Sequence, residues 1–141
     1  MFPRSVAEII VSYNCFIDCI DVDKLDWGGL SANSAAINLI KAELKLNPGS
    51  KKINWHELCR NPAAKDLIKT ELKLNPNSTK IDWDKLTINS FSVDIVTNKL
   101  KQTPDFKKIN WEWLGLNPVM INIITTEYKL NPDSTKIDWT W

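Results

Sequence analysis

Five tryptophans recur at a fixed interval of 28 residues: Trp27, Trp55, Trp83, Trp111 and Trp139. A fixed period of this size is the sequence signature of stacked supersecondary units. Chains of this kind present an extended surface, and copying one unit leaves little room for a single catalytic group of residues. The period therefore predicts a binding or structural repeat protein.

Alignment on these tryptophans needs no gaps and divides the chain into four full units and a partial fifth. The units span residues 25–52, 53–80, 81–108 and 109–136, and the partial unit spans 137–141. Each opens with an aliphatic residue, Asp or Asn, and Trp, and each full unit has Leu three positions after the Trp. Because Asp and Asn are favoured N-caps, and residues three apart share a helix face, each opening predicts a short helix.

An asparagine recurs after each predicted short helix: Asn33, Asn61, Asn89 and Asn117. In two units Pro follows it, which favours a helix start because the first helical N–H has no partner to lose. Apolar residues then recur at intervals of three and four, which predicts a longer amphipathic helix. A proline at a later position of each unit ends this helix, because the residue before proline is steered out of the helical region. These prolines are Pro48, Pro76, Pro104 and Pro132.

The residues before the first unit fit the same register. Segment 6–19 occupies the position of a longer helix without its short partner, so we expect residues 1–24 to form an N-terminal capping helix. The predicted fold is all-α: an α-solenoid of four 28-residue helix-turn-helix repeats, with this capping helix and a truncated fifth repeat. Segment 6–20 carries Glu8, Asn14 and Asp18, so it predicts neither a signal peptide nor a membrane span. We expect a soluble intracellular protein.

Composition excludes several classes of function. Lys and Arg total 18 against 17 Asp and Glu, so no overall field would draw the chain onto nucleic acid or an anionic membrane. His56 is the only histidine and is expected at the surface, while Cys15, Cys19 and Cys59 lack metal-ligand spacing. The cysteines are interpreted as small buried residues in a reducing compartment. We predict no enzyme, no cofactor and no metal site.

A lysine precedes each unit opening after the first: Lys52, Lys80, Lys108 and Lys136. Stacked units would place these lysines about 10 Å apart. One interpretation is a phosphate-tracking stripe for single-stranded nucleic acid. The other, which the small net charge favours, is local pairing with the acidic residue two positions on, as Lys80 with Asp82. The once-per-unit glutamates Glu43, Glu71 and Glu127 are interpreted as surface charges.

The end of the sequence contains a candidate docking patch. We expect Ile137 and Trp139 to cover the fourth unit, as each earlier Ile and Trp covers its predecessor. Trp141 is matched by Trp113 in the fourth unit, whereas other units carry no tryptophan at this position. An apolar pair beyond the covered core is a candidate contact for a partner or a second copy. The alternative is that Trp141 packs on Trp113 and completes the core.

The unit as a whole resembles a known type of repeat. Ile-Asn/Asp-Trp, then Leu, then Asn-Pro with an aliphatic helix and a second Asn-Pro, is similar to the short Trp/Asn-Pro repeats in proteins of nucleocytoplasmic large DNA viruses. The likeness covers residues 25–141, and the 28-residue period is longer than the commonest form. The resemblance implies a viral origin and a non-enzymatic role, such as a minor capsid protein that bridges other capsid proteins.

Three hypotheses about function follow. The preferred one is a structural or protein-binding solenoid in the virion, with capsid proteins or further copies of the chain as partners. The second is a soluble adaptor in the infected host cell that binds a host protein through its concave surface. The third, least favoured, is single-stranded nucleic-acid binding along the lysine column.

Overall fold

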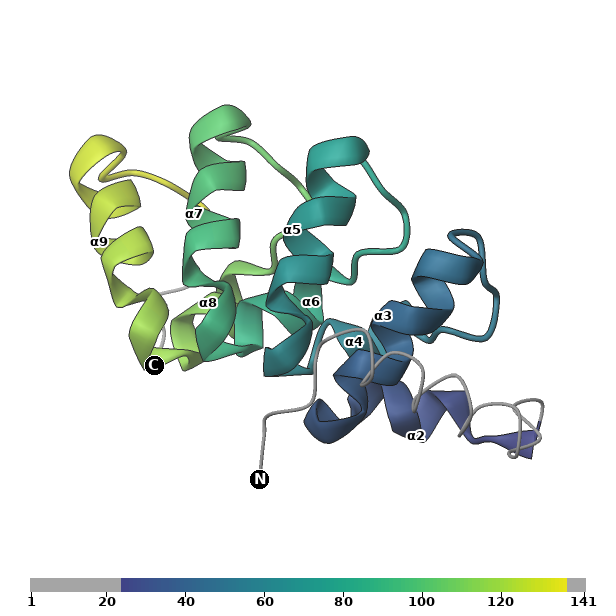
Figure 1. The fold of residues 1–141 in the computed structure, drawn as a ribbon. Helices are drawn as coiled ribbons and strands as arrows, with labels where there is room; N and C mark the ends of the chain where they lie inside the picture. Colours follow the sequence, from purple (N-terminus) through teal and green to yellow (C-terminus); the bar gives the residue numbers. More distant parts are fainter. Residues whose placement is uncertain (1–23, 137–141) are drawn as a thin grey trace, which may run out of the picture.

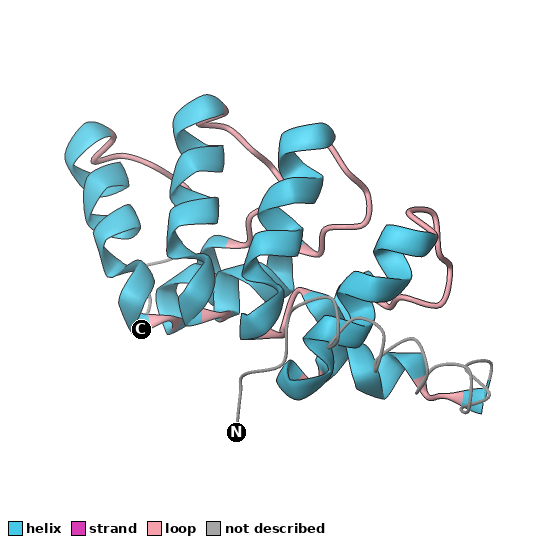
Figure 2. Ribbon diagram, viewed as in Figure 1, coloured by secondary structure: helices cyan, strands magenta, loops and turns pink. Residues whose placement is uncertain are grey.

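The computed structural model describes residues 24–136, and every regular element in that range is a helix (Figure 2). The predicted all-α fold is therefore confirmed there. The capping helix and the partial fifth repeat, with Trp139 and Trp141, lie outside the described residues. None of the helices in the described range has the length and apolarity needed to cross a bilayer.

Each of the four repeats contains a short α-helix, a 3-10 turn and a longer α-helix. The short helices are α2 (Trp27–Ala32), α4 (Trp55–Leu58), α6 (Trp83–Ile88) and α8 (Trp111–Leu116). The 3-10 turns are η2 (Ser34–Ala36), η3 (Pro62–Ala64), η4 (Ser90–Ser92) and η5 (Pro118–Met120). The longer helices are α3 (Ile37–Leu46), α5 (Lys65–Leu74), α7 (Val93–Gln102) and α9 (Ile121–Leu130).

The short helices begin where the sequence predicts. In α4, the Asn54 side chain accepts a hydrogen bond from the backbone N–H of Glu57 at 3.2 Å. Such a bond satisfies one of the N–H groups that a first helical turn leaves without a partner. Asp26, Asp82 and Asn110 cap the other three short helices in the same way.

The longer helices begin differently from the prediction. Asn61 accepts a hydrogen bond from the N–H of Ala63 at 3.0 Å, but the turn that it caps is 3-10, and α-helical geometry starts at Lys65. The N–H of Ala64 bonds to the Asn61 carbonyl at 3.0 Å, the three-residue spacing that defines 3-10 geometry. Each asparagine thus marks the start of the longer helical segment, and the α-helix proper starts later.

The longer helices end as predicted. Asn47, directly before Pro48, has φ −137° and ψ 86°, outside the helical region, and the other three ends adopt nearly the same conformation. The N–H of Asn47 still donates to the Glu43 carbonyl at 2.7 Å. Proline therefore ends the helix through the conformation of the residue before it.

Successive repeats lie next to one another. Figure 1 shows α3, α5, α7 and α9 following one another across the molecule, with the short helices grouped at one end of them. Among the short helices, α2 packs on α4 and α6 packs on α8. The core between repeats contains one fully buried leucine from each of three repeats: Leu58, Leu86 and Leu114. The tryptophans differ, because Trp27 and Trp83 are buried whereas Trp55 and Trp111 are half-buried.

The capping asparagines also join neighbouring repeats. The amide of Asn61, only 1% exposed, donates to the Ser31 carbonyl of the preceding repeat at 3.0 Å. Asn117 donates in the same way to the Thr87 carbonyl at 2.9 Å. One side chain therefore caps its own helix with its oxygen and holds the preceding repeat with its nitrogen. Because both partners are buried, these bonds fix how one repeat sits on the next.

Candidate functional site

In three repeats a lysine from the predicted column lies over a tryptophan ring. The Lys80 Nζ atom lies 5.0 Å from the centre of the Trp55 ring, within the range of a cation–π interaction. The other two pairs are Lys52 over Trp27 and Lys136 over Trp111, both at 5.7 Å. The ammonium groups of these three lysines therefore already contact a tryptophan of their own repeat.

The prediction that these lysines pair with the acidic residue two positions on is wrong for Lys80. Its Nζ lies 3.2 Å from Glu71 Oε2, and Ser78 donates to the other oxygen of Glu71 at 2.6 Å. The proline-containing loop after α5 brings the lysine back beside its own long helix, which the local sequence spacing does not reveal. The Glu71 side chain is only 14% exposed, so its interpretation as a simple surface charge is also wrong.

The fourth repeat has the equivalent lysine–glutamate pair and one further ion pair. Lys136 Nζ lies 3.1 Å from Glu127 and 3.1 Å from Asp105, which belongs to the preceding repeat. Burial would lower the pKa of Lys136, but the hydrogen bonds to these two carboxylates outweigh it and raise the pKa. Lys136 is therefore held as a charged contact between the third and fourth repeats.

The third repeat departs from this pattern. Lys99 stands at the position of Glu71, Phe106 at that of Ser78, and Lys108 at that of Lys80. The cation over the tryptophan now comes from the long helix, since Lys99 Nζ lies 5.9 Å from the Trp83 ring and 4.6 Å from the Phe106 ring. Lys108 is exposed and makes no hydrogen bond or ion pair with any described residue.

This exchange creates a feature that the sequence interpretation missed. Trp83 and Phe106 pack edge to face with their ring centres 4.9 Å apart, and Lys99 is only 8% exposed. The Lys99 ammonium donates to the Pro76 carbonyl of the preceding repeat at 2.9 Å. The signal was present in the sequence, because Glu and Ser change together to Lys and Phe in a single repeat.

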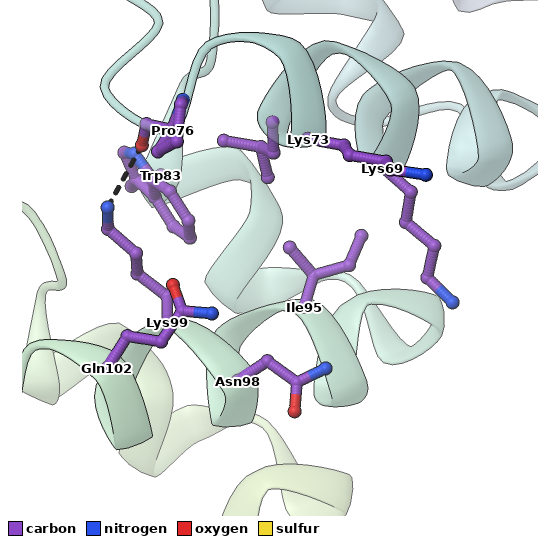
Figure 3. A pocket seen from close by; sticks show the side chains of 9 residues that line it. Lys69, Lys73, Pro76, Trp83, Ile95, Asn98, Lys99 and Gln102 are labelled. Carbon is purple, nitrogen blue, oxygen red and sulfur yellow. Dashed lines mark hydrogen bonds between the residues drawn. The ribbon is translucent and has the colours of Figure 1, made fainter.

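A groove of about 400 Å³ runs beside Lys99, between α5 and α7. Lys69 and Lys73 of α5 and Asn98, Lys99 and Gln102 of α7 line it; in Figure 3 the Lys99 ammonium points to Pro76 on one side, and the Lys69 and Lys73 ammonium groups lie on the other. At its edge Asp94 pairs with Lys69 at 2.6 Å and with Lys65 at 3.0 Å. Partial burial would raise the pKa of Asp94, but the two lysines outweigh it and lower the pKa. These ion pairs connect α5 to α7.

The predicted docking patch is described only in part. Trp113 is 38% exposed at the surface of α8, while Trp141 lies outside the described residues. Further large apolar side chains are exposed in the same repeat: Leu116, Val119, Ile121, Tyr128 and Leu130. The fourth repeat thus exposes more large apolar side chains than Trp113 alone.

His56 and Cys59 both lie next to the start of α6. His56, half exposed as predicted, contacts a carboxylate oxygen of Asp82 through Nδ1. Cys59 is fully buried, and its sulfur accepts a hydrogen bond from the Asp82 N–H at 3.4 Å. Burial raises the pKa of the Cys59 thiol to about 11, despite the opposing effect of this hydrogen bond. The interpretation of Cys59 as a small buried residue is confirmed.

Cys59 is therefore expected to resist alkylation in the folded protein. At about pH 8 an ordinary thiol, with a pKa of about 8.5, is partly ionised and reacts, whereas Cys59 is both neutral and covered. Iodoacetamide labelling followed by peptide mass spectrometry should leave Cys59 unmodified in buffer and modify it fully in urea. Rapid labelling of Cys59 in buffer would contradict its placement in the core.

Comparisons with protein-family models, with curated proteins and with solved structures found no match for this chain. The class of protein is therefore described from the structure of the chain itself. Across residues 24–136 it is an all-helical chain of repeated two-helix units, in which Trp, Asn and Lys recur at equivalent positions.

Proposed function

We propose that the chain is an α-solenoid that binds a protein partner along the ends of its long helices and has no catalytic role. The observation that carries this proposal is a row of exposed leucines. The last residue of the long helix is leucine in three repeats, and each is largely exposed: Leu46 (75%), Leu74 (79%) and Leu130 (72%). Because the contacts between repeats do not bury these side chains, a row of them at one helical position favours a surface that contacts another protein.

The resemblance to Trp/Asn-Pro repeats supports a more specific role, that of a minor capsid protein in a large DNA virus. A structural protein that bridges others needs an extended scaffold with a repeated contact position. The ordered row of long helices (Figure 1) and the leucines at their ends provide such a scaffold. An adaptor for a host protein would use the same surface and is the alternative.

The lysine column gives less support to nucleic-acid binding. Two of its four members have a carboxylate close to their ammonium groups, Lys80 with Glu71 and Lys136 with Glu127. A cation that is already paired gains less from a phosphate, because binding must first break the existing pair. Lys108 lacks such a contact among the described residues.

Cross-linking and mass spectrometry of purified virus particles test this role. We expect the chain to be present and to be cross-linked to capsid proteins. A Leu46→Ser/Leu130→Ser variant should keep its helical circular dichroism and lose the cross-links. The matched control is Lys45→Ser/Lys129→Ser, which changes the neighbouring exposed positions of the same two helices. Absence of the chain from particles would contradict the capsid role, and equal behaviour of the two variants would contradict the leucine contact.

A further inference from the structure

The groove between α5 and α7 is a basic pocket with an apolar floor. Its charged lining residues are all lysines: Lys69, Lys73 and Lys99. Leu72, Trp83 and Ile95 contribute apolar surface, and Asn98 and Gln102 contribute side-chain amides that can donate hydrogen bonds (Figure 3). The nearby carboxylate of Asp94 lies within ion-pair distance of Lys69. The lining therefore carries an excess of positive charge.

Among the residues that line the groove, Lys99 gives the strongest indication that a ligand binds there. In the second and fourth repeats, the lysine over the tryptophan has a glutamate within 3.2 Å and 3.1 Å, respectively. Lys99 is nine-tenths buried, and its ammonium contacts the Pro76 carbonyl, the Asn77 side-chain oxygen and two aromatic rings, but no carboxylate of a described residue. A buried cation without a full negative charge nearby is costly, and an incoming anion reduces that cost.

We propose that this groove binds an acidic peptide segment, whose carboxylates supply the negative charge that Glu71 and Glu127 supply beside the lysines of the second and fourth repeats. The proposal rests on the proposed protein-binding function and names the chemistry of the partner. The methylene groups of a glutamate side chain match the apolar lining, and carboxylates of successive acidic residues match the separate ammonium groups of Lys69, Lys73 and Lys99. The groove also adjoins the leucine row, because Lys73 directly precedes Leu74 and Gln102 occupies the leucine position.

The small number of lysines without a paired carboxylate favours a peptide ligand over a nucleic acid. A phosphate backbone carries regularly spaced charges and gains affinity from many contacts. The neighbouring repeats neutralise their own lysines with Glu71 and Glu127, so the excess of charge is confined to one groove. A short stretch with one or two carboxylates matches a site of this size.

The test uses the full chain and a fluorescein-labelled oligoglutamate peptide, with binding followed by fluorescence anisotropy. The key variant is Lys99→Glu/Phe106→Ser, which gives the third repeat the glutamate and serine that the second repeat has at these two positions. Its Glu, Ser and Lys108 can form the cluster seen at Glu71, Ser78 and Lys80, so we expect it to fold. The variant should bind the peptide at least about tenfold more weakly, a loss of about 1.4 kcal/mol.

The matched control is Lys45→Glu, which changes the net charge by the same amount on α3. It should leave the affinity for oligoglutamate within about twofold, since a distant surface charge adds only a weak screened attraction. An oligothymidylate of similar charge should bind the original chain more weakly than the peptide does.

Equal affinities of the two variants for oligoglutamate would overturn the proposal, as would tighter binding of the oligothymidylate. A wrong assignment of the ligand of the groove can be distinguished from a wrong proposed function. If Lys99→Glu/Phe106→Ser keeps the cross-links in virus particles that Leu46→Ser/Leu130→Ser loses, the protein-binding role stands and the acidic ligand is wrong.

Discussion

Replacing Trp83 with alanine is expected to lower the free energy of unfolding by about 3–5 kcal/mol, the usual cost of truncating a large buried aromatic side chain. Trp83 is only 4% exposed, packs against Phe106 and lies beneath the Lys99 ammonium. Its loss would leave a cavity in the third repeat and remove an aromatic ring that partly compensates a buried cation. Urea denaturation followed by far-UV circular dichroism measures the change.

Trp113→Ala is the matched control, because it removes the same side chain from a position that is 38% exposed. We expect it to cost no more than about 1 kcal/mol, in keeping with a surface substitution. Trp83→Phe, which keeps a ring beside Phe106 and Lys99, should fall between the two. Equal losses for Trp83→Ala and Trp113→Ala would contradict the assignment of Trp83 to the core.

Asn61→Asp is the second substitution with a large expected effect. The new side chain has nearly the same shape and can still cap η3, but it replaces the amide that donates to the Ser31 carbonyl with an oxygen. A buried carbonyl without a donor costs about 1–3 kcal/mol, and a buried carboxylate beside it adds to the cost. We expect the free energy of unfolding to fall by at least about 2 kcal/mol.

Asn33→Asp separates the capping role of the recurring asparagine from its hydrogen bond to the preceding repeat. Asn33 caps the equivalent turn by accepting from the Ala35 N–H at 3.0 Å, but it is exposed. Asp and Asn are similar N-caps, so this change should alter the free energy of unfolding by no more than about 0.5 kcal/mol. If the two substitutions cost the same in urea denaturation, the bond between repeats would contribute nothing and only the cap would matter.

The local structure of each repeat was predictable from the sequence because its signals are short-range. An N-cap such as Asn54 acts on an N–H three residues away, and Pro48 acts on the residue before it. The 3-10 geometry after Asn61 was not predicted, because the same Asn and Pro residues fit the start of either type of helix.

The contacts across loops and between repeats could not be predicted in the same way. Lys80 reaches Glu71 because the loop after α5 folds back, and Asn61 reaches Ser31 because two repeats pack at a particular register. Neither distance follows from spacing along the chain. Lys99 lies outside the constant column of lysines, at a position where the other three repeats carry glutamate, so the column did not predict its role.

The central claim is that the repeats stack in a row, and spin-label distances test it most directly. Lys45, Lys101 and Lys129 hold the same exposed position in the first, third and fourth repeats. Nitroxides on Lys45→Cys/Lys101→Cys and on Lys45→Cys/Lys129→Cys, with Cys15 and Cys19 changed to Ser, would give two distances by pulsed electron resonance. With about 8–10 Å between adjacent helices, a row predicts that the second distance exceeds the first by several ångströms. An equal or shorter second distance would mean that the helices close into a bundle and would contradict the α-solenoid.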